Sequence, residues 1–424
     1  MPRMPDGLVL APFRALRYDA RTVGDLAAVL SPPYDVIDAA ARERLEATSP
    51  YNVVRLILPR GPETGPHSRY AEAARTLTNW RNEGVLVADA EPALYVYEES
   101  QGEHVQRGLV GALGLVPFDD GVVLPHENVM AGPVADRLAL MTATEANLEP
   151  IFCVYDGGGA ATEIAAEAAD GDPLADVATS DGTRHRLWAI TKPQLLAAVA
   201  ADLRPRRAVI ADGHHRYTTY LHMQDERRAA GSGPGPWDYG LTLLDDALAF
   251  GPQVHAIHRV IRDLDVGRAA RVAETTFKVR HIDRGIGAAL GELEAAGKTG
   301  PAFVVTDGTS SYLLTEPDPK AVTAALPKGR SEAWRSLDVT VAHHLLIKGV
   351  WGLADTEEGV GYAHDVEEAL AQAAAVNGIA LLLNPTPVEA VAAIAAEGDR
   401  MPRKSTLFTP KPQSGLLLRT FDTE

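Results

Sequence analysis

The sequence predicts an α+β fold of mixed α/β character, in which helices and strands follow one another along the whole chain. Two observations indicate this class. Patterns typical of strands and of helices both occur from one end of the chain to the other, and they lack the regular strand–helix–strand period of doubly wound or barrel proteins. The sequence also contains no internal repeat.

The composition is typical of a globular protein and excludes several kinds of partner. The chain has 424 residues, of which 46% are hydrophobic and 23% charged, and we expect two or three domains. Its net charge of −17 opposes binding to DNA, RNA or anionic lipid, although a small anion can still bind where the local charge is positive. We therefore expect a small-molecule ligand, and neither a nucleic acid nor a membrane as partner. The oligomeric state is not predicted.

We expect the protein to be cytoplasmic. The one cysteine, Cys153, cannot form a disulfide within the chain and lies in an apolar run, where a buried hydrophobic role is expected. No apolar run approaches the ~20 residues that span a bilayer, and residues 1–7 lack the apolar core of a signal peptide.

The N-terminal region, residues 1–92, is expected to combine short strands and helices. Its apolar periodicity predicts strands at 7–12 and 52–58 and helices at 22–30, 39–48 and 68–83. After the first helix, Pro32 and Pro33 stiffen a turn before Tyr34. Asp35 follows, and it is expected either to cap a helix or to face a substrate.

The central region, residues 93–260, contains most of the predicted strands. We expect a hairpin of strands at 93–100 and 106–117, followed by strands at 121–124, 150–155, 183–190, 208–212, 239–244 and 249–257. Helices are predicted at 134–146, 161–169, 192–202 and from residue 216 onward. The Gly- and Pro-rich segment 231–236 is expected to be an exposed loop.

The segment Asp212-Gly213-His214-His215-Arg216 carries the strongest functional signal. It joins an apolar strand pattern to a helical pattern. A strand that turns sharply into a helix directs backbone N–H groups and the positive end of the helix dipole at one point, which favours phosphate. Asp212 could hold a metal ion or accept a proton beside that anion. The alternative is that the two histidines cap the helix and pack against the sheet.

A second group of candidates follows the predicted strand at 121–124. Glu127 could act as a general base on a hydroxyl if burial raises its pKa, and His126 precedes it. Arg137, on the next predicted helix, could bind a carboxylate or phosphate of the substrate. The alternative is an ordinary loop followed by a surface arginine.

The C-terminal region, residues 261–424, is predicted to alternate helices and strands. The helices are expected at 266–277, 285–296 and 339–351, and the strands at 302–306, 311–315 and 415–419. The region also contains a basic loop, MPRKSTLFTPK, in which Lys404, Ser405, Thr406 and Lys411 could neutralise a polyphosphate. The alternative is a solvated loop before the final strand.

Together these motifs resemble a bacterial and archaeal family known only as a domain of unknown function, family ten-fifteen. The resemblance runs from about Ala11 to Leu418, and the label of the family names no activity. It rests on the segments SPPYDV, NVVRL, LPHE, DRL, ANLEPIF, ADGHHRY, LLNPTPVE and MPRKSTLFTPK.

The Gly-His-His-Arg turn is also similar, more distantly, to the phosphate-binding turn of the ParB and sulfiredoxin superfamily. It resembles in particular the free serine kinases of that superfamily, which phosphorylate the hydroxyl of L-serine. This resemblance implies a ParB/sulfiredoxin-like phosphate-binding core with additional α/β elements. It implies that Gly213–Arg216 hold the donor phosphates, that Asp212 is a functionally needed acid, and that Glu127 is the base. The second half of the chain has no counterpart in those kinases.

We therefore predict a small-molecule kinase that transfers a phosphoryl group from ATP, ADP or pyrophosphate to a hydroxyl, with free L-serine as acceptor by resemblance. Asp212 and Glu127 are the predicted catalytic residues, and Mg²⁺ is the expected cofactor. The predicted phosphate-binding residues are Gly213, His214, His215, Arg216, Lys404, Ser405, Thr406 and Lys411. The predicted substrate-binding residues are Asp35, His126 and Arg137.

Two other functions are open. One is a non-catalytic, nucleotide-binding regulatory protein that keeps the ParB-like turn for binding alone. The other is a metal-dependent hydrolase that uses Asp212, His214 and His215, although adjacent histidines rarely bind one ion together.

Overall fold

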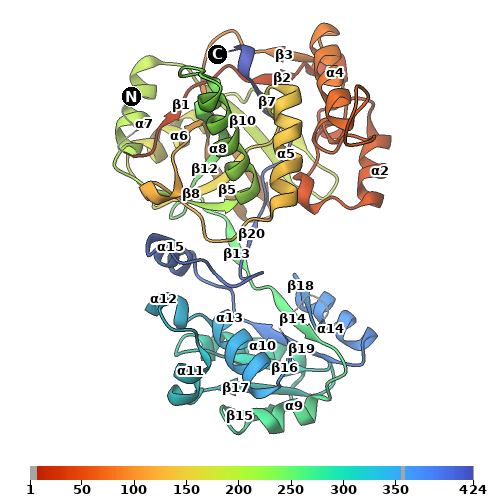
Figure 1. Cartoon of the computed structure of the whole chain (residues 1–424), viewed down its shortest axis with the longest axis vertical. Coiled ribbons are helices and arrows are strands. Elements are labelled where there is room, and N and C mark those ends of the chain that lie inside the picture. Colours follow the sequence, from red (N-terminus) through yellow and green to blue (C-terminus); the bar gives the residue numbers. More distant parts are fainter. Residues whose placement is uncertain (1–6, 355–358, 424) are drawn as a thin grey trace. The chain divides into compact units, whose positions relative to one another are not determined.

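The computed structural model of the chain describes residues 7–354 and 359–423, which form two compact units (Figure 1). The first unit comprises Met1–Pro252 and Pro410–Glu424, and the second comprises Gln253–Thr409. The second unit is therefore an insertion in the first, whereas the sequence predicted three consecutive regions. Both units combine helices with sheets, so the predicted mixed α/β class is confirmed. Residues 1–6, part of the segment in which no signal peptide was expected, lie outside the described residues.

The first unit is built on a mixed sheet of nine strands. Their order is β6-β11-β8-β12-β5-β4-β10-β9, with β1 beside β5. β11 runs parallel to β6 and antiparallel to β8, so the chain leaves β6 and β11 at the same edge of the sheet. The strands are β1 (Leu10–Ala11), β4 (Leu94–Gln101), β5 (His104–Gly114), β6 (Val123–Leu124), β8 (Ile151–Tyr155), β9 (Ala175–Ala178), β10 (Arg184–Ile190), β11 (Ala208–Asp212) and β12 (Tyr239–Asp246).

Apolar side chains of four helices pack against one face of this sheet. The helices are α5 (Ala131–Thr144), α6 (Ala160–Ala169), α7 (Pro193–Leu203) and α8 (His214–Ala229). Cys153 lies fully buried in this core, where burial raises the pKa of its thiol, as expected of a residue in a hydrophobic role. Tyr217 of α8 is also fully buried, and burial of a large apolar side chain contributes roughly 1.5–3 kcal/mol. This packing fixes α8 on the sheet.

Shorter elements complete the first unit. The long helix among them, α4, lies within the predicted helix 68–83 and buries Leu77 and Trp80. The helices are α1 (Ala20–Val23), η1 (Ala27–Val29), η2 (Tyr34–Val36), α2 (Ala39–Thr48), α3 (Val54–Ile57), α4 (Arg69–Asn82), η3 (Phe118–Asp120), η4 (Pro236–Asp238) and η6 (Phe421–Thr423). The strand pairs are β2 (Leu16–Tyr18) with β3 (Leu86–Ala88), and β7 (Ala146–Asn147) with β21 (Arg419–Thr420).

The predicted strand at 52–58 is wrong, because this segment forms the short helix α3. The Asn52 side chain accepts a hydrogen bond from Val54 N at 3.0 Å. It also donates to Ala28 O and Leu30 O, at 2.9 and 2.8 Å. These bonds start a helical turn, and the apolar residues that follow are buried on all sides, which hides the helical period.

Three further predictions need correction where a side chain or a glycine bends the backbone. The predicted helix at 22–30 is interrupted at Gly24, which has a φ of 76°. The predicted strand at 249–257 is reduced to β13, because Asp246 Oδ1 accepts hydrogen bonds from Leu248 N and Ala249 N and forms a turn. The predicted strand at 415–419 is reduced to β21, after Gly415 with a φ of 104°.

The second unit contains an antiparallel sheet of six strands in the order β15-β17-β16-β19-β14-β18. These strands are β14 (His258–Ile261), β15 (Lys278–Ile282), β16 (Phe303–Thr306), β17 (Ser311–Thr315), β18 (Val360–Ala363) and β19 (Ile379–Leu383). A separate pair joins β13 (Gln253–His255) to β20 (Leu407–Thr409). The helices are α9 (Val266–Ala273), α10 (Gly285–Gly297), α11 (Pro319–Ala325), α12 (Glu332–Arg335), α13 (Asp338–Val341), the π-helix η5 (Ala342–Val350), α14 (Val366–Ala375) and α15 (Val388–Ala396).

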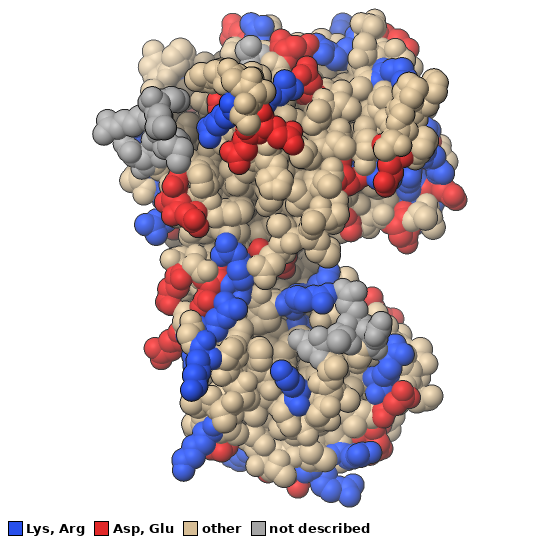
Figure 2. Space-filling model, in the orientation of Figure 1, with Lys and Arg blue, Asp and Glu red and all other residues tan. Residues whose placement is uncertain are grey.

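The surface carries charges of both signs. On the face shown in Figure 2, acidic and basic side chains are interspersed over both units. Among the described residues, no helix has the length and apolar character needed to cross a membrane.

Candidate functional site

The predicted strand–turn–helix is present at Asp212–Arg216. β11 ends at Asp212 and α8 begins at His214, with Gly213 between them at a φ of 95°, which favours glycine. A Cβ atom on this glycine would lie 3.1 Å from Nε of Arg216. Glycine therefore allows both the sharp turn and the close approach of the Arg216 guanidinium to it.

Arg216 is almost fully buried behind this turn, with 5% of its surface exposed. Its Nη1 donates a hydrogen bond to Pro150 O at 2.6 Å, and its Nη2 donates to Asp212 Oδ2 at 2.5 Å. Its Nε is also buried but has no hydrogen-bond partner in the described part of the chain. A buried N–H without an acceptor costs about 1–3 kcal/mol. An oxygen of a ligand at the turn would satisfy it.

Asp212 lies between two cations. Its Oδ1 is 2.5 Å from Nζ of Lys411, and the same ammonium is 3.1 Å from Oδ2 of Asp35. Burial alone would lower the pKa of Lys411, but the two carboxylates outweigh burial and raise it. For Asp35, burial opposes the effect of Lys411 and Arg216, which together lower the pKa of its carboxyl. Three predicted site residues from distant parts of the sequence thus meet in one ion-pair group.

The helix-cap interpretation of Asp35 is wrong. Asp35 lies inside η2 and its carboxylate binds Lys411, while the next helix, α2, is capped by the side chain of Asp38. The expected contact of Asp35 with a substrate stays a prediction.

The three candidate histidines hold the LPHE loop against the turn. His126 and His214 are buried with their rings 4.5 Å apart and nearly perpendicular, so both imidazoles point inward. The backbone N–H of His126 donates to Nε2 of His214 at 3.2 Å, and Nδ1 of His126 lies 2.8 Å from Ile210 O. His214 therefore packs, as the alternative interpretation expected, and its Nε2 is engaged. The ligand set of the hydrolase alternative is not assembled.

His215 is the more accessible histidine of the turn. Its Nε2 accepts a hydrogen bond from Met130 N at 3.0 Å, which requires that nitrogen to be unprotonated. Burial lowers the pKa of His215, although the nearby carboxylates of Glu127 and Asp35 oppose this shift. A neutral imidazole at physiological pH follows.

Glu127 lies at the same sheet edge as Asp212. It follows β6, whose Leu124 pairs with Val209 of the parallel strand β11, so the two motifs leave the sheet side by side. Its side chain is half-buried and close enough to His215 to influence the pKa of that histidine. The position is compatible with a general base.

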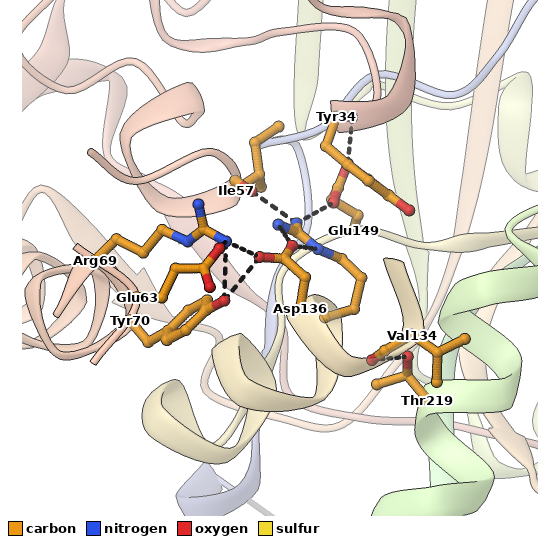
Figure 3. A network of polar contacts seen from close by, with 10 residues as sticks. Tyr34, Ile57, Glu63, Arg69, Tyr70, Val134, Asp136, Glu149 and Thr219 are labelled. Atoms are coloured by element: carbon orange, nitrogen blue, oxygen red, sulfur yellow. Dashed lines mark hydrogen bonds and ion pairs between the residues drawn. The ribbon is translucent and has the colours of Figure 1, made fainter. Parts of the chain in front are cut away.

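Arg137 is held by protein partners. Its guanidinium donates to Ile57 O at 2.7 Å and to Asp136 Oδ2 at 2.5 Å, and it lies 4.2 Å from the centre of the Tyr34 ring. Figure 3 shows this network, which also includes Glu149 at 3.8 Å from Arg137 Nη1. Its predicted contact with a substrate stays a prediction.

Glu149 is a residue that sequence reasoning missed. Its carboxylate accepts hydrogen bonds from Tyr34 N at 2.9 Å and from Ser414 Oγ at 3.2 Å, so it joins the turn before Asp35 to the segment after Lys411. Burial raises the pKa of Glu149, against the opposing effect of Arg216 and Arg137. An acid inside the largely apolar ANLEPIF segment was the signal that could have indicated this role.

A small cavity adjoins this network. It has a volume of about 30 Å³ and is lined by Arg137, Glu149, Arg216 and Tyr220 among others. A cavity of this size and polarity holds about one water molecule.

The remaining basic-loop residues belong to the second unit. Lys404 adopts a φ of 52°, and its carbonyl accepts a hydrogen bond from Arg259 Nη2 at 2.8 Å. Ser405 Oγ donates to Pro402 O at 2.5 Å. The expected phosphate contacts of Lys404, Ser405 and Thr406 stay predictions.

Comparisons with known proteins give a family and a set of distant structures. A family model described as "Protein of unknown function (DUF1015)" matches residues 10–340. No curated protein matches the chain.

Three of the similar solved structures show how low the similarity is. A free serine kinase variant in complex with ADP is 13% identical, with 71% of this chain and 90% of that chain covered and a TM-score of 0.34. A conserved hypothetical protein from Pyrococcus furiosus is 13% identical, with 73% and 93% covered and a TM-score of 0.31. SbnI with a C-terminal truncation, from Staphylococcus aureus, is 11% identical, with 72% and 85% covered and a TM-score of 0.33.

Proposed function

The chain belongs to the DUF1015 family of proteins of unknown function, and we propose that it is a small-molecule phosphotransferase. It would transfer a phosphoryl group from ATP, ADP or pyrophosphate to a hydroxyl. By the resemblance of its Gly-His-His-Arg turn, free L-serine is the preferred acceptor.

The observation that carries the proposal is the unpartnered, buried Nε–H of Arg216 beside the start of α8. A helix begins with backbone N–H groups that have no partner in the helix, and its dipole places positive charge there. A phosphate at Gly213 would accept from these groups and from Arg216 together. Phosphoryl transfer requires mainly such positioning and charge neutralisation.

Lys411, Asp35 and Asp212 would bind the phosphates of the phosphoryl donor. Lys411 Nζ now bridges Asp35 and Asp212, and it would turn to the phosphate oxygens when they arrive. The pair of carboxylates then suits Mg²⁺, which proteins bind through one or two carboxylates together with phosphate oxygens and water. When bound, Mg²⁺ would neutralise charge on the donor phosphates.

Glu127 would act as the base at the acceptor. The hydroxyl oxygen forms a bond to the transferred phosphorus, the bond from phosphorus to the leaving phosphate oxygen breaks, and the hydroxyl proton passes to the Glu127 carboxylate. The half-buried position of Glu127 at the sheet edge shared with Asp212 supports this role.

The first test is a screen of donors against acceptors. Purified protein with Mg²⁺ and ATP, ADP or pyrophosphate is incubated with L-serine and other hydroxylated amino acids and polyols, and products are followed by ³¹P NMR. We expect a phosphomonoester product with at least one pair. Absence of donor consumption across the panel would refute the proposal.

The matched variants are Asp212→Asn and Asp225→Asn. Asp212→Asn removes the charge at the head of the turn and should reduce transfer about 10³-fold or more, since transition-state electrostatics is lost. Asp225 is exposed on the same helix, so its variant should retain full activity. Circular dichroism should show both variants folded.

One observation favours the regulatory alternative. Asp212 already forms ion pairs with both Arg216 and Lys411. A carboxylate held in this way can help to bind a nucleotide without taking part in a reaction. Tight nucleotide binding without turnover, unaffected by Asp212→Asn, would select that function.

A further inference from the structure

A group of buried carboxyl and amide side chains lies on the sheet face opposite helices α5–α8. It consists of Glu99 on β4, Gln106 on β5 and Asp245 on β12, and we call it the Glu99 cluster. Leu244, which precedes Asp245, and Leu109, three positions after Gln106, belong to the core beneath the helices. Alternation along a strand therefore places the cluster on the other face.

The strand register brings the three residues together. Glu99 is directly opposite Gln106, and Gly108, the next β5 residue on this face, is directly opposite Asp245. A Cβ atom on Gly108 would lie 1.9 Å from Oδ1 of Asp245, so the Asp245 carboxyl occupies the space above this glycine. Residues opposite or diagonal to one another across strands lie within reach of long side chains.

All three side chains are buried, with 3%, 1% and 0% of Glu99, Gln106 and Asp245 exposed. Neither carboxyl oxygen of Asp245 and neither amide atom of Gln106 has a hydrogen-bond partner within the described residues. Buried polar atoms without partners in the protein are rare and costly, so four of them on one sheet face can together bind a ligand.

The cluster also has no compensating base among the described ion pairs. The closest candidate is His185, whose Nδ1 is 3.9 Å from Glu99 Oε2, and burial lowers the pKa of this histidine to about 4, so it is neutral. Burial raises the pKa of Glu99 to about 8 and that of Asp245 well above its usual range. The other titratable groups that act on the cluster include Asp181, Asp246, Cys153 and Tyr97, whose hydroxyl donates a hydrogen bond to Glu99 Oε2 at 3.0 Å.

We propose that the Glu99 cluster binds one divalent metal ion of the kind that prefers oxygen ligands, such as Ca²⁺ or Mg²⁺. The ligands would be the carboxylates of Glu99 and Asp245 and the amide oxygen of Gln106. No three His, Cys, Asp or Glu side chains form a metal centre in the part of the chain that the structure describes, and here the third oxygen comes from a carboxamide.

Charge and ligand chemistry select this occupant. Two positive charges balance two carboxylates, whereas a monovalent ion would leave one negative charge buried without a base. Carboxylate and amide oxygens are the ligands of Ca²⁺ and Mg²⁺. A protein that held only water here could do so with hydroxyl or amide side chains, without burying two acids.

Binding should release protons, because the metal replaces the protons on Glu99 and Asp245.

The test uses full-length protein treated with a chelator and then dialysed. Thermal unfolding is measured in Ca²⁺, Mg²⁺ or Mn²⁺ and in KCl of equal ionic strength. We expect one divalent ion to raise the Tm of the wild type by roughly 5 °C, with stoichiometric binding and proton release by calorimetry in two buffers. Asp245→Asn and Glu99→Gln should weaken binding at least tenfold.

Two controls separate this site from others. Glu98→Gln changes the adjacent acid on the opposite face, which pairs with Arg107 and Arg186, and should keep the response to the ion. Asp225→Asn, which changes an exposed acid of α8, should keep it too.

A wild type whose Tm responds to no divalent ion, and which takes up none by mass spectrometry, overturns the proposal. So does an ion response that Asp245→Asn and Glu99→Gln leave intact. If these variants do not fold, the metal content and proton release of the wild type decide.

Discussion

At the scale of single residues, the candidate site depends on the absence of a side chain at Gly213. The φ of 95° and the 3.1 Å approach of Arg216 Nε to the position of a Cβ both require glycine. The turn, the ion pair of Arg216 with Asp212, and the direction of the unpartnered Nε–H are thus coupled through one residue.

Gly213→Ala should destabilise the protein by about 1–3 kcal/mol, because alanine is strained at this φ. It should also weaken binding of pyrophosphate, since the added methyl displaces the Arg216 guanidinium. Urea unfolding and calorimetric titration measure the two effects. Gly233→Ala, in an exposed loop with nothing within 4 Å of its Cβ position, should change neither. Equal effects of the two variants would contradict the argument.

At the scale of elements, Glu149 connects segments that are far apart in sequence. It holds Tyr34 of η2 and Ser414 of the C-terminal segment through two hydrogen bonds. Asp35 is adjacent to the first of these and Lys411 precedes the second, so the Asp35–Lys411–Asp212 group depends on Glu149 for its alignment. Its role is to position, since it is buried behind the site.

Glu149→Ala should cost about 1–3 kcal/mol, because it leaves Tyr34 N and Ser414 Oγ without their buried acceptor. Hydrogen exchange should increase at residues 31–36 and 410–418 together, because both lose their acceptor. Glu149→Gln keeps an acceptor and should show a smaller increase. Glu145→Ala removes an exposed acid and is the control. An increase confined to one of the two segments would contradict a shared anchor.

The sequence predicted the motifs of the candidate site better than the ion pairs and hydrogen bonds that join these motifs. The strand–Gly–helix signal at Asp212–Arg216 and the family resemblance were both correct, because turn chemistry and motifs are local. The ion pairs of Asp35 and Lys411 and the role of Glu149 depend on contacts across hundreds of residues. Local patterns contain no such distances. The helix α3 was missed for a related reason, since Asn52 starts it through carbonyls on another segment.

At the scale of the molecule, the second unit enters and leaves the first at a single paired point. Gln253 of β13 lies directly opposite Thr409 of β20. Paired residues of antiparallel strands have Cα atoms about 4.5–5.5 Å apart. The first unit therefore has its two chain ends, Pro252 and Pro410, close together.

Replacing residues 253–409 by a short Gly-Ser linker should leave a first unit that folds cooperatively. Circular dichroism and urea unfolding test the fold, and pyrophosphate titration tests the turn. Binding within threefold of the full chain is expected if the Gly213 turn and Lys411 suffice. A loss of tenfold or more in a folded protein would assign part of the phosphate site to Lys404, Ser405 or Thr406.

The same connection sets an order of events during translation. Lys411 and Arg419 follow the insertion in the sequence, so they leave the ribosome only after the whole insertion has been made. Arg419 donates hydrogen bonds to Asn147 Oδ1 and Pro236 O. A nascent chain therefore carries Asp212 without its ammonium partner until synthesis has passed residue 411. The candidate site is therefore complete only after the C-terminal segment 410–423 has joined the first unit.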